Sequence, residues 1–163
     1  MGAEIGRRSG LLLVLVALAG PAWAAPRITD AAARDFLARQ ERLWNARDLA
    51  NFFATYAPAA VIADQARTGD GKIVPYGSST VAQARAQAKR ALARSRVSQA
   101  SEVLSVAVAP DGRSARTLQR QTSRIETGGK VRMVCGESAQ TLGLAGGRIV
   151  SMAQTDTVVR CPH

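Results

Sequence analysis

Hydrophobic positions near the start of the chain repeat with a helical period. In "AAARDFLARQERLW" one face carries an apolar stripe, which predicts an amphipathic helix capped by Thr29 or Asp30. The positions of that stripe are Phe36, Leu37, Leu43 and Trp44. A second helix is predicted for "LANFFATY", capped by Asp48 and ended by Pro58, because proline cannot continue a helical hydrogen-bond ladder.

The period changes after Pro58. "AAVIAD" predicts a short strand, "QARTGDGKIVPYGSS" a long glycine-rich connection, and "VAQARAQAKRALARSR" a helix that Ser78, Ser79 or Thr80 opens. From Val97 onward the pattern has period two, and "PDG", "TGG" and "AGG" are hairpin signals. They divide the rest into four strands, at about residues 97–109, 114–126, 130–144 and 148–159. Strands this long exceed the usual ~5 or 6 residues, so the sheet should twist and bend.

These elements predict an α+β fold in which a curved antiparallel meander wraps over the N-terminal helices. The aromatic faces of the helices need an apolar partner, and the sheet is the large surface available. A bent sheet closed by helices leaves an internal pocket. Gln40 interrupts the apolar stripe of the first helix, so it should either hydrogen-bond to a buried group or line that pocket.

Residues 1–24 read as a secretory signal peptide, in which Arg7 and Arg8 precede "LLLVLVALAG" and "AWAA". The apolar run is about half of the ~20 residues that cross a bilayer. We therefore expect a single domain over residues 25–163 in the periplasm or the medium, without a transmembrane anchor in the mature form.

The two cysteines, Cys135 and Cys161, are candidates for a disulfide in an exported protein. A two-residue turn at Gly146 and Gly147 would place Cys135 opposite Val158, which is too far from Cys161 for a direct bridge. A bulge in the last strand, or a tail that folds back at Pro162, would bring the cysteines together.

The chain has 22 basic and 12 acidic residues, a net charge of +10, which favours anionic partners such as acidic glycans, lipid headgroups or small anions. Export and a 4% aromatic content argue against a nucleic-acid partner. The helix from Val81 concentrates basic residues, which form either a solvated face or an anion-binding patch. They are Arg85, Lys89, Arg90, Arg94 and Arg96.

The stretch "WNARDLANFFATYAPAAVIAD", together with the order helix, helix, strand, helix, meander, resembles the cone-shaped nuclear transport factor 2-like superfamily. Its members include ketosteroid isomerases, scytalone dehydratases, polyketide cyclases and binding domains. The resemblance to the isomerases implies that Asp64 stands where a carboxylate base moves a proton beside a carbonyl. It also puts Gln40 and Ala139 at the two oxyanion-hole positions, where neither supplies the phenol or the acid that the chemistry needs.

Histidine chemistry is excluded by composition, because His163 is the only histidine. That removes the scytalone dehydratase pattern, a serine–histidine triad and a His-based zinc site. We expect no metal and no cofactor.

Strand alternation supplies the remaining candidate residues of the pocket. The third meander strand is expected to face inward with Ala139 and Glu137, and the last with Met152, Gln154 and Asp156. The second strand is polar on both faces. The predicted lining residues are Gln40, Trp44, Asp64, Tyr76, Arg120, Glu137, Gln154 and Asp156.

Each candidate also has a purely structural interpretation. Asp64 is either a general base or a strand end that accepts backbone hydrogen bonds. Glu137 and Asp156 either face a ligand or pair with arginines of the second strand. Trp44 and Tyr76 would be core or wall residues.

Three functions therefore remain. The first is an exported domain that binds a polar small molecule without transforming it, and we expect that molecule to be an anion. The second is an isomerase, cyclase or dehydratase without metal that uses Asp64 as base and Gln40 or Tyr76 as donor. The third is binding of acidic envelope polymers through the basic helix. A homodimer is compatible with each, and the sequence specifies neither the ligand nor any turnover.

Overall fold

The computed structural model describes residues 26–162, so the predicted signal peptide lies outside the described residues. The helices are α1 (Asp30–Asn45), α2 (Leu49–Phe53) and α3 (Val81–Arg94). The strands are β1 (Tyr56–Arg67), β2 (Ile73–Thr80), β3 (Arg96–Val108), β4 (Ser114–Thr127), β5 (Lys130–Ala145) and β6 (Arg148–Val159).

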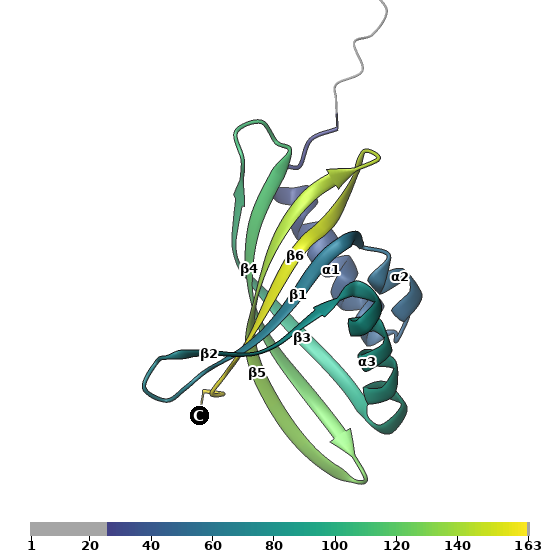
Figure 1. Cartoon of the computed structure of the whole chain (residues 1–163), viewed down its shortest axis with the longest axis vertical. Coiled ribbons are helices and arrows are strands. Elements are labelled where there is room, and N and C mark those ends of the chain that lie inside the picture. The colour runs from purple at the N-terminus through teal and green to yellow at the C-terminus, as the bar shows by residue number, and fades with distance from the viewer. Residues whose placement is uncertain (1–25, 163) are drawn as a thin grey trace, which may run out of the picture.

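The strands form one six-stranded sheet in the order β2-β1-β6-β5-β4-β3. Neighbouring strands are antiparallel except β1 and β6, which pair in parallel. Figure 1 shows that the long strands bend and that the helices lie together on one side of the sheet. The predicted α+β class and the curved meander are confirmed.

Local side chains set the helix starts as predicted. Thr29 caps α1 by accepting a hydrogen bond from the backbone N–H of Ala32, and Asp48 caps α2 by accepting from Asn51. Thr80 caps α3 in a capping box with Gln83, in which each side chain bonds the other's backbone. These bonds satisfy N–H groups that a helix start leaves without partners.

Arg47 connects the corner between α1 and α2 to the end of α3. Its guanidinium donates to the backbone carbonyls of Leu92 (3.5 Å) and Ser95 (3.1 Å), where the helix leaves carbonyls without partners. Arg47 adopts a φ of 58°, a conformation uncommon for a residue with a side chain. The contact fixes α3 relative to the other helices.

Two predicted elements were wrong in extent. The second helix ends at Phe53 rather than Tyr56, and Tyr56 begins β1. The predicted connection is largely a β-hairpin, whose second strand β2 lies at the sheet edge. Pro75 is tolerated there because an edge strand has an unpaired side. A bulge in the pairing, with Asp64 opposite Gly77 and Gln65 opposite Pro75, leaves Tyr76 without a register partner.

The four meander strands agree with the predicted ones to within one residue at each end. Gly146 and Gly147 form the last turn with φ values of 55° and 75°, as a two-residue hairpin turn requires. The register of β5 and β6 shifts after Thr141 and places Cys135 opposite Val159. The predicted bulge is therefore present, and the Cα atoms of Cys135 and Cys161 are 5.1 Å apart in a disulfide.

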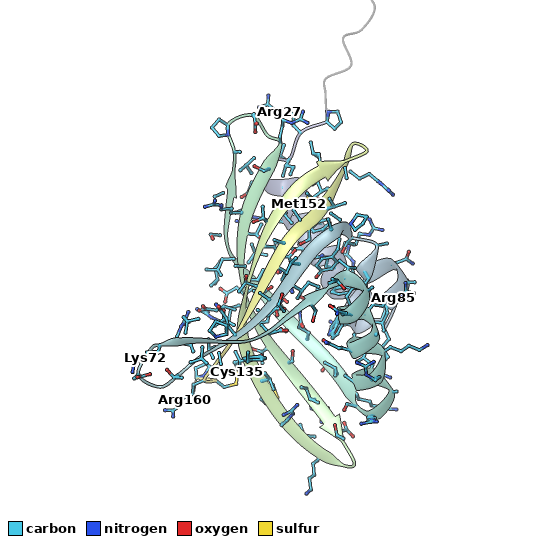
Figure 2. All side chains as sticks on the ribbon, in the orientation of Figure 1. Arg27, Lys72, Arg85, Cys135, Met152 and Arg160 are labelled. Carbon is cyan, nitrogen blue, oxygen red and sulfur yellow. A yellow bond between two sulfur atoms is a disulfide. The ribbon has the colours of Figure 1, made fainter. Side chains whose placement is uncertain are left out.

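The C-terminal end of β6 is fixed by that disulfide. Figure 2 shows Cys135 close to Arg160, and Lys72 at the far tip of the β1–β2 hairpin. No helix in residues 26–162 is long and apolar enough to span a membrane.

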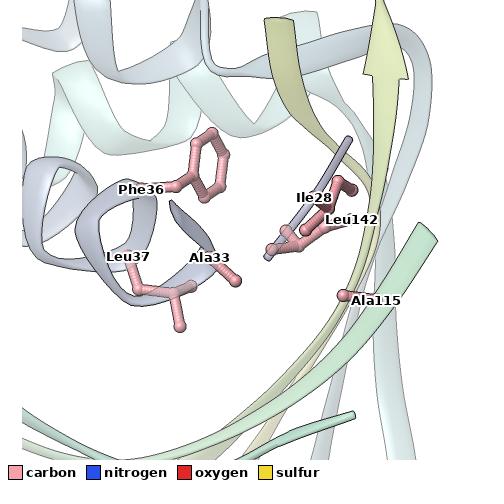
Figure 3. Close-up of a cluster of buried hydrophobic side chains, with 6 residues drawn as sticks. All are labelled: Ile28, Ala33, Phe36, Leu37, Ala115 and Leu142. Atoms are coloured by element: carbon pink, nitrogen blue, oxygen red, sulfur yellow. The ribbon is translucent and has the colours of Figure 1, made fainter. Parts of the chain in front are cut away.

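Two hydrophobic clusters form the core. The first lies between α1 and the sheet (Figure 3) and consists of Ile28, Ala33, Phe36, Leu37, Ala115 and Leu142. The second lies under α2 and α3 and consists of Phe53, Tyr56, Ala57, Ala60, Ile62 and Val150. Each buried Leu or Phe side chain contributes about 1.5–3 kcal/mol by leaving water.

Candidate functional site

A cavity of about 320 Å³ lies between the helices and the sheet, bounded by residues of both hydrophobic clusters. Its walls come from all three helices and from β1, β3, β4, β5 and β6, with Ser79 of β2. The volume is at the lower end of the ~300–1,000 Å³ range of small-molecule sites. The helices and the bent sheet therefore leave between them a partly open space large enough for a small ligand.

The space exists because α3 presents small side chains to it. Ala84, Ala88 and Ala91 line the cavity together with Gln87, at the spacing of one helical face. Methyl groups fill little of the volume between helix and sheet. The basic side chains Arg85 and Lys89 are exposed.

Glutamine is the characteristic residue of the lining. The seven glutamines of the lining are Gln40, Gln87, Gln99, Gln119, Gln121, Gln140 and Gln154. Two of them bond each other at the base of the cavity: Nε2 of Gln140 donates to Oε1 of Gln40 over 3.0 Å. Gln40 in turn donates to Oγ1 of Thr55 over 2.8 Å. Gln40 thus satisfies buried polar groups and lines the cavity, which combines the two roles predicted for it.

A second hydrogen-bonded chain leads to a carboxylate. The Tyr56 hydroxyl donates to Oε1 of Gln154 over 2.6 Å, and Nε2 of Gln154 donates to Oδ2 of Asp156 over 2.7 Å. Asp156 is the register partner of Asp64 in the parallel pair of β1 and β6. Their side chains therefore leave the same face of neighbouring strands, and both line the cavity.

Both aspartates are harder to ionise than an ordinary aspartate. Burial raises the pKa of Asp64. Burial also raises the pKa of Asp156, and the negative charge of Asp64 raises it further. The Ser138 hydroxyl lies near enough to lower the pKa of Asp156, but neither that hydroxyl nor Oδ1 of Asp156 meets the geometry of a hydrogen bond.

Aromatic rings form the wall between α1 and α2. The ring centroids of Trp44 and Phe52 are 5.2 Å apart, and those of Phe52 and Tyr56 are 5.6 Å apart. Tyr56 is 5% exposed, and burial raises the pKa of its hydroxyl. The cavity therefore joins an apolar wall to a polar floor.

The predicted site residues divide into two groups. Those that line the cavity are Gln40, Trp44, Asp64, Gln154 and Asp156. Three do not line it. Tyr76 is 62% exposed on the edge strand, where burial and then the charges of Asp64 and Asp156 raise the pKa of its hydroxyl. Arg120 pairs with Glu102, and Glu137 pairs with Arg67.

The predicted inward phase of β5 was wrong. Ala139 is exposed, whereas Ser138 and Gln140 are buried, because Leu142 of the same phase enters the first hydrophobic cluster. Met152, expected to face inward on β6, is 46% exposed. It lies against Gly143, where an added Cβ would stand 2.9 Å from its Cγ.

Several lining residues were missed from the sequence, namely Gln87, Gln99, Gln119, Gln121 and Gln140. On β4 the sequence left both phases open, and the structure puts Gln119 and Gln121 in the cavity and Arg120 on the exposed side. The alanine stripe of α3 was a usable signal, since three small residues on one helical face predict a space beside it.

The lining has acidic but no basic side chains. Glu41, Asp64 and Asp156 line the cavity, and neither lysine nor arginine does. Within residues 26–162, no group of three potential metal ligands among His, Cys, Asp and Glu lies together. The side chains of the lining can therefore form hydrogen bonds with a ligand and can contribute negative charge.

Comparison with known proteins identifies the fold. No family profile and no curated protein matches the chain. A ketosteroid isomerase-like protein from Erwinia carotovora atroseptica superposes with a TM-score of 0.64 at 12% identity, covering 80% of this chain and 96% of that one. This is the nuclear transport factor 2-like fold.

Two further structures share it. One is a nuclear transport factor 2-like protein of unknown function from Shewanella oneidensis MR-1, with a TM-score of 0.58 at 14% identity, covering 78% of this chain and 97% of that one. The other is the beta subunit of benzoate 1,2-dioxygenase from Burkholderia mallei, with a TM-score of 0.59 at 16% identity, covering 80% and 91%. The nuclear transport factor 2-like fold thus occurs in proteins of different kinds.

Proposed function

We propose that residues 25–163 form an exported, single-domain protein that binds a polar small molecule in the cavity without transforming it. The observation that carries this proposal is the partly open, glutamine-lined space of about 320 Å³ beneath α3. A cavity of that size beside an alanine stripe sacrifices the stability that larger apolar side chains would contribute. Binding of a ligand would account for a space that lowers the stability of the protein.

Export is supported by two features. The Cys135–Cys161 disulfide is compatible with an oxidising compartment outside the cytoplasm, and residues 1–24 have the pattern of a secretory leader. The periplasm and the medium are the proposed locations.

Catalysis by Asp64 has less support than binding. Its raised pKa suits a general base, but an enolate also needs hydrogen-bond donors aimed at its oxygen. The amide of Gln40 already donates to Thr55 and accepts from Gln140. Ala139, at the other expected donor position, is exposed.

Filling the cavity tests the binding function. Ala88→Phe places a ring into the space beside α3, whereas Ala86→Phe adds the same ring on the exposed face of the same helix. A set of small cations, anions and neutral polar molecules is screened against residues 25–163 by native mass spectrometry and thermal melting. At least one molecule should bind to the wild type and to Ala86→Phe with similar affinity. The same molecule should bind at least tenfold more weakly to Ala88→Phe.

The contrary result is equally clear. If no molecule binds, or if each one binds the two phenylalanine variants equally, the cavity is not a ligand site. Circular dichroism establishes that both variants are folded.

A further inference from the structure

The two aspartates of the cavity have no cationic partner. The ion pairs of residues 26–162 join Arg34 to Asp30, Arg67 to Glu137, Lys72 to Asp70, Arg120 to Glu102 and Arg124 to Glu126. None includes Asp64 or Asp156. Carboxylates that share a partly buried site are normally paired with a positive charge or a metal, or they keep a proton. A cationic group that entered the cavity would therefore find two carboxyl groups available to it.

Gln140 gives an independent indication of the same polarity. The side chain is 5% exposed and lines the cavity, yet its Oε1 has no hydrogen-bond partner. The orientation of the Gln140 amide follows from its neighbours. The carbonyl of Phe52 can only accept a hydrogen bond, so the Thr55 hydroxyl must donate to it. Thr55 then accepts from Gln40, so Gln40 can only offer its carbonyl to Nε2 of Gln140.

Among the buried lining atoms without a partner, Oε1 of Gln140 is an acceptor and Nε1 of Trp44 is a donor. Oδ1 of Asp156 is a further acceptor that makes no hydrogen bond of normal geometry, although the Ser138 hydroxyl lies near this carboxyl group. Neither a hydrogen bond nor a cation from the described residues offsets the burial of Asp64. A ligand that donates hydrogen bonds would satisfy more of these atoms than one that accepts them.

The aromatic wall suits the rest of such a molecule. Trp44 packs against Phe52 and Phe52 against Tyr56, and all three residues line the cavity. Aromatic rings bury apolar carbon and attract cations. A molecule with a short hydrocarbon body and a positive end would contact the wall and the aspartates together.

The net charge of +10 favours an anionic ligand instead. The arginines of β4, however, are exposed on the far side of the strand from Gln119 and Gln121. Salt screens such charges over about 8 Å at physiological ionic strength. The local carboxylates dominate inside the cavity, where screening is weaker.

Given the proposed binding function, we propose that the ligand is an organic cation with N–H donors, a primary ammonium compound of low mass. Its charged group lies between Asp64 and Asp156, and its carbon body lies against Trp44, Phe52 and Tyr56.

Three probes of one shape test the charge. The 2-phenylethylammonium ion, neutral 2-phenylethanol and the phenylacetate anion are titrated by calorimetry into residues 25–163. The ammonium should bind at least tenfold more tightly than the other two. Asp64→Asn and Asp156→Asn should each weaken ammonium binding at least tenfold, while the matched charge change Asp35→Asn, on the exposed side of α1, should leave it unchanged.

The other outcomes separate this proposal from the binding function. If phenylacetate or the alcohol binds best, or if the Asp64 and Asp156 variants bind the ammonium normally, the ligand class is wrong and the cavity remains a site. If none of the three probes binds, the ligand class is judged from the screen of small molecules described under the proposed function. The charge of the molecules that bind the wild type but not Ala88→Phe then decides between a cationic ligand and another class. Cations among them support the proposal, and anions or neutral molecules overturn it. If that screen is also empty, both proposals fall.

Discussion

At the residue scale, buried side chains of the cavity satisfy each other where they can and leave a few atoms free. Gln40 and Gln140 close one hydrogen-bonded chain and Gln154 another. Gln40 was predictable because it interrupts an apolar stripe. Gln140 was not, since the choice between the two faces of β5 depended on where Leu142 packs.

Asp156→Asn should raise stability at neutral pH. Below the ordinary aspartate pKa of 3.8 the carboxyl is protonated in folded and unfolded chains alike. Between 3.8 and the raised pKa of the folded protein, the unfolded chain ionises while the folded chain keeps its proton. The wild type therefore loses stability as pH rises across this interval, and the loss is complete above it. Asparagine avoids that loss and can still accept from Gln154.

Thermal melting across pH measures the effect. The melting temperature of Asp156→Asn should exceed that of the wild type by a few degrees near pH ~7.5, and the difference should shrink on acidification toward pH ~3. A variant that is less stable at neutral pH would show that the carboxylate is held by a favourable interaction instead.

At the element scale, regular patterns were predictable and edge features were not. The meander strands follow from three glycine-rich turns with alternation between them. Strand β2 escaped prediction because Pro75 and Gly77 interrupt its pattern, and an edge strand with a bulge tolerates both. The end of α2 was misplaced because Phe52, Phe53 and Tyr56 have helical spacing, although Tyr56 already belongs to β1.

Asn45, the last residue of α1, fastens this helix to the edge strand β3. Its Nδ2 donates to the Gln99 carbonyl over 2.8 Å, and its Oδ1 accepts from the Gln99 N–H over 2.8 Å. The amide replaces a neighbouring strand at this point of the edge. Asn45→Ala should lower the free energy of unfolding by about 1–3 kcal/mol.

Urea denaturation checks this value with a graded control. Asn45→Asp keeps the acceptor for the Gln99 N–H but loses the donor, so its stability should fall between those of the wild type and Asn45→Ala. Identical unfolding midpoints for all three proteins would contradict the assigned role.

At the scale of the whole molecule, the disulfide joins the final residues to the middle of the sheet. Cys135 and Cys161 enclose a loop with a sequence separation of 26, and Cys135 is 6% exposed. Closing such a loop limits the unfolded chain and stabilises the fold by about 3–4 kcal/mol in the chain-entropy account.

The double variant Cys135→Ala, Cys161→Ala should therefore unfold at a clearly lower temperature, with a loss of that size in chemical denaturation. Wild-type protein unfolded in the presence of a thiol reductant should match the double variant. Equal stability of the oxidised and reduced wild type would mean that the bridge adds nothing to the fold.

The parallel pairing of β1 with β6 joins strands from opposite ends of the domain. Gln154 and Asp156 both lie on β6, so the cavity is incomplete until β6 has paired with β1. Contacts this distant along the chain slow folding. The cavity should therefore form late in folding, when the N-terminal and C-terminal strands of the sheet have been brought side by side.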